Sequence, residues 1–132
     1  MTGSSCLFSQ YQEWVKVYNG SGNSGDEGFK LKVDPQGNTY VLAKVLSTGF
    51  NTNIGIIKYD AAGVQQWAVE YNGPANLEDY AADITIDNNG NSYICGIISQ
   101  GNSNLDIVTL KYNSAGAQQW AVTWAGTAQF DD

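Results

Sequence analysis

A repeat of 53 residues is the feature that most limits what this chain of 132 residues can fold into. Trp14, Trp67 and Trp120 lie 53 residues apart, and the segment WVKVYNG that begins at Trp14 returns as WAVEYNG at Trp67 and as WAVTWAG at Trp120. Because the copies align without gaps, they indicate one structural unit that is used more than once. The chain holds two copies of this unit and the start of a third.

Two more motifs return at the same spacing. The segment VDPQGNTYV (33–41) becomes IDNNGNSYI (86–94), and IKYDAAGVQQW (57–67) becomes LKYNSAGAQQW (110–120). The shared positions are Trp, Tyr, Asp, Gly, Asn and Lys-Tyr, whereas the positions between them change among apolar residues. Such a pattern is typical of a duplicated structure.

Each repeat is predicted to form four β-strands. The segments are short and rich in Val, Ile, Tyr and Trp, and none has the sustained apolar stripe of a helix. We therefore expect an all-β chain without significant helix. The predicted strands are 29–33, 39–46, 54–59 and 64–71, followed by 82–86, 92–99, 107–112 and 117–124.

The connections between these strands are of two kinds. The segments 34–37 and 60–63 begin with Asp and end with Gly, as type I turns do, and both return in the second repeat as 87–90 and 113–116. Because an antiparallel meander alternates direction, these tight turns gather at one end of the sheet. The longer loops are predicted at 47–53, 72–81 and 100–106, at the other end.

Several strands are apolar on both sides, such as 54–57 and 93–98, so the sheets need cover on both faces. Cys95 takes the position of Leu42 in the first repeat and is predicted to be a small buried residue. Its spacing from Cys6, in a polar leader, supports no disulfide. Four-stranded meanders stacked on copies of themselves are the blades of a β-propeller.

The motif order Asp-x-x-Gly-Asn-x-Tyr, Lys-Tyr-x-x-x-Gly and a Trp strand ending in Tyr-Asn-Gly resembles the bacterial β-propeller repeat family named for its seven-bladed members. The resemblance covers about residues 14–132. It implies a propeller-like scaffold, found mostly in large surface or secreted bacterial proteins, and it brings no catalytic residues. A cytoplasmic location stays open, because Met1–Gln12 lack the basic start and apolar run of a signal peptide.

Two blades do not close a propeller, which takes at least four. We divide the chain into a leader (1–13), an orphan copy of the fourth strand (14–18), two blades (29–71 and 82–124) and a tail (125–132). Uncovered blade faces would be large apolar patches, so a homo-oligomer is expected. Three chains would give six blades, and the orphan strand could pair across the junction by strand exchange. A fragment of a longer gene is the alternative.

The charge balance excludes two classes of partner. Six Lys, no Arg and no His stand against 13 acidic residues, for a net charge of -7. Nucleic acids and anionic membrane surfaces are bound through clustered Arg and Lys, so neither is an expected partner. No segment is long and apolar enough to span a bilayer, and a soluble chain is expected.

No catalytic apparatus, cofactor or metal site is predicted. The glycines of 20–25 match a dinucleotide fingerprint but precede a strand, and the Asp87–Asn91 segment lacks the spacing of a calcium loop. Glu78, Asp79 and Tyr80 on a long loop are the best candidates for a ligand site. We expect a non-enzymatic scaffold for a protein or glycan; the alternatives are a carbohydrate-active enzyme using those carboxylates, or a fragmentary repeat protein without an evolved ligand.

Overall fold

The computed structural model describes residues 12–126. Residues 1–11 of the leader, including Cys6, and residues 127–132 of the tail lie outside this range. Within it the chain forms eight strands and no helix, so the predicted all-β class is confirmed. The strands are β1 (Glu27–Val33), β2 (Thr39–Leu46), β3 (Thr52–Tyr59), β4 (Gln65–Tyr71), β5 (Asp79–Ile86), β6 (Ser92–Gly101), β7 (Asn104–Tyr112) and β8 (Gln118–Trp124).

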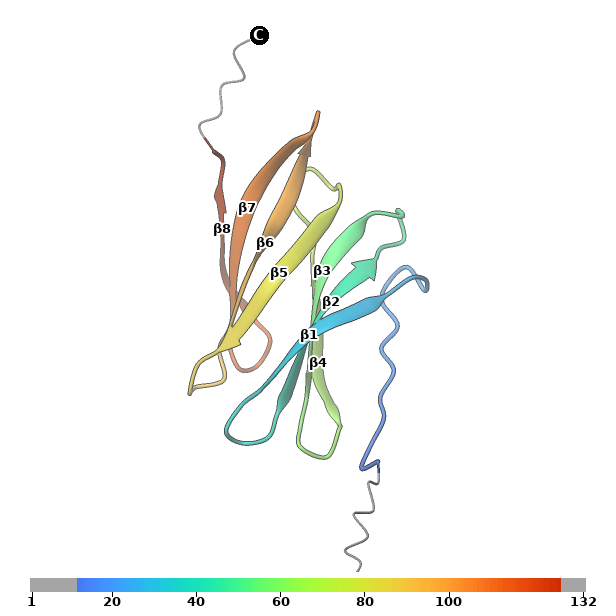
Figure 1. Cartoon of the computed structure of the whole chain (residues 1–132), viewed down its shortest axis with the longest axis vertical. Coiled ribbons are helices and arrows are strands. Elements are labelled where there is room, and N and C mark those ends of the chain that lie inside the picture. The colour runs from blue at the N-terminus through green and yellow to red at the C-terminus, as the bar shows by residue number, and fades with distance from the viewer. Residues whose placement is uncertain (1–11, 127–132) are drawn as a thin grey trace, which may run out of the picture.

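The strands form two antiparallel meanders of four strands each. Sheet 1 has the order β1-β2-β3-β4 and sheet 2 the order β5-β6-β7-β8, so each sheet is one copy of the repeat. The tight turns lie at one end of the molecule and the remaining hairpins and the inter-sheet connection at the other (Figure 1). Within the described residues, the two predicted four-stranded units are therefore both present.

The four tight turns use the chemistry that the sequence predicts. In the first turn an Asp34 carboxylate oxygen accepts hydrogen bonds from the amides of Gln36, at 3.0 Å, and Asn38, at 2.9 Å. The first residue of each of the other three turns makes the same pair of bonds, with Asn113 replacing an aspartate in the last one. These side chains bind the donors that the sharp turn leaves without strand partners.

The prediction of a long loop at 100–106 is wrong. β6 continues to Gly101 and β7 begins at Asn104, so the connection is a two-residue hairpin of Asn102 and Ser103. Both residues have positive φ, 50° and 63°, as a type I′ turn requires. Asn tolerates this conformation and is common there, but Ser is not the glycine that usually marks such a turn.

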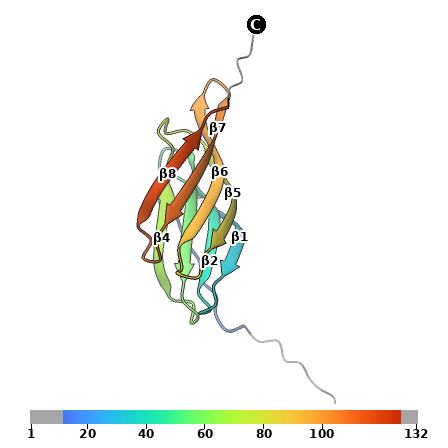
Figure 2. The same ribbon diagram turned by 90° about the vertical axis from the view of Figure 1, so that its left-hand side faces the viewer.

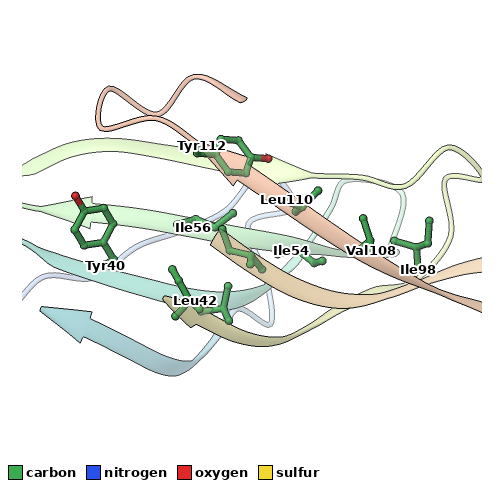
Figure 3. Close-up of a cluster of buried hydrophobic side chains, with 10 residues drawn as sticks. Tyr40, Leu42, Ile54, Ile56, Ile98, Val108, Leu110 and Tyr112 are labelled. Carbon is green, nitrogen blue, oxygen red and sulfur yellow. The ribbon is translucent and has the colours of Figure 1, made fainter. Parts of the chain in front are cut away.

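The main core lies between the two sheets. Sheet 1 contributes Tyr40, Leu42, Ile54 and Ile56, and sheet 2 contributes Ile84, Ile94, Ile98, Val108, Leu110 and Tyr112. Figure 3 shows most of these side chains pointing into the layer between the strands. A smaller cluster of Ala43, Val45, Ile57 and Tyr59 lies on the opposite face of sheet 1.

The predicted orphan strand at 14–18 is not a strand in this structure. The segment is extended along the side of sheet 1 that faces away from sheet 2 (Figure 1), and no backbone hydrogen bond joins it to the sheets of the described chain. Its repeat counterpart, β4, pairs with β3, but β3 already has β2 and β4 on its two edges. The segment therefore has an apolar sequence suited to a strand, but the β3 strand beside it is already paired on both sides.

Candidate functional site

The predicted acidic pair, Glu78 and Asp79, does not form a shared surface. Glu78 is exposed, whereas Asp79 is fully buried at the start of β5 and accepts a hydrogen bond from the amide of Gly73. Burial raises the pKa of Asp79 above its ordinary value, and the bond from Gly73 opposes part of that rise. Asp26, 53 residues earlier, accepts a bond from Gly20 in the same way, which indicates that this carboxylate fixes the loop.

Tyr80 lies apart from the two carboxylates. Its ring is 38% exposed and lines a shallow hollow at the edge between the sheets, with Phe29 and Lys44. The hollow has a volume of about 200 Å³ and contains one acidic side chain, Glu27. Of the three predicted residues, Glu78 and Tyr80 are thus exposed and Asp79 is buried, and only Tyr80 lines this hollow.

The Asp87–Asn91 segment uses its carboxylate within the turn. Asp87 accepts bonds from the side chain of Asn91 and from the amides of Asn91 and Asn89. These bonds, that of the Asn91 side chain foremost, lower the pKa of Asp87. Among residues 12–126 there is no group of three or more His, Cys, Asp or Glu side chains that could hold a metal ion.

Another candidate surface follows from how the two sheets pack. Sheet 1 turns toward sheet 2 the face that carries Tyr40, Leu42, Ile54 and Ile56. Sheet 2 turns the other face of the repeat toward sheet 1. Its core residues lie 53 positions after residues on the opposite face of sheet 1: Ile94, Ile98, Leu110 and Tyr112 correspond to Val41, Val45, Ile57 and Tyr59. The sheets therefore pack front to back, through unlike faces.

A small polar and aromatic cluster fixes this packing. The indole of Trp67 lies against Gly116, and its Nε1 donates to the carbonyl of Ser114 at 3.0 Å. Lys58 donates to the same carbonyl at 3.2 Å, and its ammonium lies 5.1 Å from the centre of the Tyr40 ring. A side chain at Gly116 would meet the indole, because a Cβ built there lies 2.7 Å from Trp67 Cδ2.

Front-to-back packing leaves one face of sheet 2 without cover. In Figure 2 no element of the described chain lies in front of β5–β8. Ile107, Trp120, Val122 and Trp124 on this face are 47%, 38%, 58% and 61% exposed. We call it the free face; its residues are Tyr93, Cys95, Ile97, Ile107, Thr109, Trp120, Val122 and Trp124.

The predicted burial of Cys95 is wrong, because Cys95 belongs to the free face. The sequence predicts a buried residue because Leu42, its counterpart, is buried, but Cys95 is exposed. Leu42 is covered by sheet 2, and no third sheet covers Cys95 among the residues that the structure describes. Repeat equivalence therefore predicts the strand position correctly and the burial wrongly.

The free face already carries the cluster that joins the two sheets elsewhere. Tyr93 and Trp120, the counterparts of Tyr40 and Trp67, have ring centres 6.3 Å apart, compared with 6.0 Å for the first pair. Lys111, the counterpart of Lys58, lies 5.2 Å from the centre of the Tyr93 ring. The arrangement is therefore formed within the single chain, without a covering sheet.

The opposite end of the stack is the face of sheet 1 turned away from sheet 2. We call it the outer face; its residues are Leu31, Val33, Val41, Ala43, Val45, Ile57, Tyr59 and Ala68. The 14–18 segment covers part of it, with the Trp14 ring 5.9 Å from that of Tyr59. The cover is incomplete, because a pocket of about 300 Å³ remains between Lys16, Tyr18 and the strands.

Comparison with known proteins adds no family to this geometry: no protein-family model matches the chain, and no curated protein is similar to it. In the part of the chain covered by the structure, no helix has the length and apolar character needed to cross a membrane.

Reasoning from the sequence predicted uncovered blade faces but not which face of each repeat is left uncovered. The signal was present in the alternation of the strands, since the two faces of each repeat carry different residues at matched positions. Which face of one repeat meets which face of the next depends on how the 72–78 connection turns the chain, and no residue motif states that.

Proposed function

We propose that the chain is a non-enzymatic interaction scaffold completed by self-association, in which the outer face of one chain docks on the free face of another. The observation that carries this proposal is the front-to-back packing of the two sheets. A front-to-back contact leaves one unused copy of each contacting face, so the same contact repeats between chains. A contact between two equivalent faces would use both copies of the contacting face, and the same contact could not repeat between chains.

A hollow on the free face lies at a position that is filled in the contact between the two sheets of one chain. On the free face, Thr85, Cys95 and Thr109 border a hollow of about 230 Å³. The corresponding region of sheet 1 is filled in the chain by residues of β5, Ile84 among them. The counterpart of Ile84 in a second chain is Leu31, which is 59% exposed and free to fill the hollow.

The charges at the edge also match. Lys30 and Asp83 occupy the same position of the two repeats, and in the chain their Nζ and Oδ1 atoms lie 2.9 Å apart across the sheets. In the proposed docking, Asp83 of one chain meets Lys30 of the next, so the charges attract. The pair is exposed, so it contributes to register more than to affinity.

A propeller-like ring is the assembly that we favour. Repeated front-to-back contacts give a closed ring when the rotation closes and a filament when it does not. Propellers close with about four to eight blades, and three chains of two sheets each would give six. The loops at one end of such a ring would be available to a protein or glycan ligand.

Size-exclusion chromatography with light scattering at micromolar concentration tests the proposal. We expect three times the mass of one chain, and a monomer at all concentrations would contradict self-association. Ile107→Lys, on the free face, should weaken association at least about a hundredfold, because burying an unpaired ammonium costs several kcal/mol. Val64→Lys is the matched control: Val64 is 53% exposed in a turn, on neither face, and its substitution should leave the mass unchanged.

The alternative of a carbohydrate-active enzyme gains no support from the loop carboxylates. A glycosidase needs two carboxyl groups that both reach the substrate. Asp79 is fully buried and accepts the amide proton of Gly73, so it does not face a cleft together with Glu78.

A further inference from the structure

Trp14 and Trp67 each lie against a turn glycine of the next sheet, and we call this position the tryptophan seat. Trp67 lies against Gly116 of sheet 2, and Trp14 lies against Gly63 of sheet 1, where a built Cβ would be 2.6 Å from Trp14 Cδ2. Gly63 and Gly116 are themselves 53 residues apart and both have positive φ, 78° and 82°. The seat at Gly63 is thus built to receive a fourth-strand tryptophan from a neighbouring sheet.

In the proposed assembly, the tryptophan that reaches this seat from the neighbouring sheet is Trp120 of a second chain. Trp120 is the counterpart of Trp67 and belongs to the free face. One seat holds one indole, so Trp14 and the Trp120 of a second chain exclude each other.

Trp14 holds the seat less completely than Trp67 holds its own. Trp67 donates to the Ser114 carbonyl and belongs to a paired strand, whereas Trp14 makes no corresponding bond to the Ala61 carbonyl and its segment has no backbone ladder. Val17 of the same segment is 89% exposed. Tyr18 packs against the cluster on the outer face and its hydroxyl donates to Glu70 at 3.4 Å. Among the described residues, 14–17 therefore have little to hold them beyond the indole contact.

The chain after this segment is firmly attached. A Glu70 carboxylate accepts bonds from the Ser21 hydroxyl, at 2.8 Å, and from the Ser21 amide, at 3.1 Å. The amide of Gly22 donates to the carbonyl of Leu46 at 2.9 Å. Residues 14–17 can thus leave the sheet while residues 21 and 22 stay in place.

We infer that residues 14–17 form a displaceable cap that occupies the Gly63 seat in the free chain and gives way to Trp120 of a second chain. The inference rests on the proposed self-association and adds a way in which the chain limits its own association. The apparent affinity of the outer face is reduced by the fraction of time that the cap is closed. Strand exchange, in which 14–18 pairs across the junction, is the opposite arrangement, because there the segment would promote association.

The test compares the self-association constants of full-length variants by sedimentation velocity over a range of concentrations. Trp14→Ala should tighten association, by about tenfold if the cap is closed in about nine-tenths of free chains. Val17→Ala, in the same segment, should have no effect, because Val17 touches little of the sheet. Trp120→Ala should weaken association at least about thirtyfold, as loss of a central aromatic anchor does. Ile107→Lys gives the same readout without removing a tryptophan, and circular dichroism confirms that each variant is folded.

The outcomes separate the cap from the assembly. If the unmodified chain associates and Trp14→Ala leaves its association constant unchanged, the cap is refuted and self-association stands. If Trp14→Ala weakens association, the segment contributes to the contact and the cap is refuted in favour of strand exchange. If neither the unmodified chain nor the Trp14→Ala variant associates at any concentration, both the self-association and the cap are refuted.

Discussion

At the scale of single residues, glycines in the tight turns decide how closely a neighbouring sheet can approach. Gly37, Gly63, Gly90 and Gly116 all have positive φ, which a residue with a side chain adopts at a cost. Gly116 has a second role, because the indole of Trp67 lies where its Cβ would be. Turn geometry accounts for all four glycines, and sheet packing adds a separate reason at Gly116.

We expect Gly116→Ala to destabilise the fold more than Gly37→Ala does. Both substitutions place alanine at positive φ, at a cost of about 1 to 2 kcal/mol. At Gly116 the new methyl also collides with Trp67, which adds about 1 to 3 kcal/mol for overpacking. At Gly37 the nearest atom is Ala61 Cβ, 3.3 Å away, which can shift slightly. Urea unfolding measures the difference, and equal losses for the two variants would contradict the packing role.

Residue chemistry explains why some predictions from the sequence held. Asp34 and Asp87 begin type I turns, and their carboxylates bind the amides two and four residues on, as Asx turns do. These bonds span few residues, so the sequence alone contains the whole interaction. The exposure of Cys95 depends on a covering layer far away in the chain or in another chain, and local sequence does not contain that layer.

At the scale of elements, strands were easier to predict than their connections. The bounds of β2 agree with the prediction at both ends, whereas β5 begins at Asp79 instead of residue 82, and β6 and β7 extend through the predicted loop. The loop prediction failed because polar residues such as Asn102 and Ser103 are typical of loops of any length. Hairpin twist selected the two-residue turn.

Ser103→Gly should stabilise the protein by about 0.5 to 1 kcal/mol, because glycine adopts positive φ without the strain that serine has there. Thermal unfolding measures the change. The matched control is Ser99→Gly within β6, where a glycine weakens the strand by about 0.5 to 1 kcal/mol. Stabilisation by both substitutions, or by neither, would mean that the turn conformation is not the cause.

The 14–18 segment shows that similarity to another copy of the repeat does not by itself make a segment a strand. Its sequence is that of a fourth strand, but a strand needs a partner edge, and within residues 12–126 both edges of the adjacent β3 are already paired. Strand propensity fits a sheet surface and does not supply one. The segment keeps the tryptophan contact of its counterpart and loses the ladder.

At the scale of the whole molecule, Cys95 offers a direct measure of whether the free face becomes covered. In a Cys6→Ser chain, Cys95 is the single thiol and is exposed in the free chain. We expect its rate of alkylation by iodoacetamide to fall with rising protein concentration, in proportion to the remaining free chains. The Ile107→Lys variant should keep the fast rate at all concentrations. A constant rate in chains that light scattering shows to be associated would place the contact elsewhere.

The sequence by itself determined the repeat, the eight strands, the tight turns and the all-β class, because these depend on contacts within a strand, a turn or one copy of the repeat. Only the tertiary structure decided which face of each sheet is buried, that Asp79 is inside while Glu78 is outside, and that residues 14–18 lie on sheet 1 without joining it. The reason is that every strand position exists twice in the chain, within the same recurring motifs. Whether such a position is covered depends on its neighbour in space, and sheet 1 has a covering sheet on a face where sheet 2 has none in the described chain.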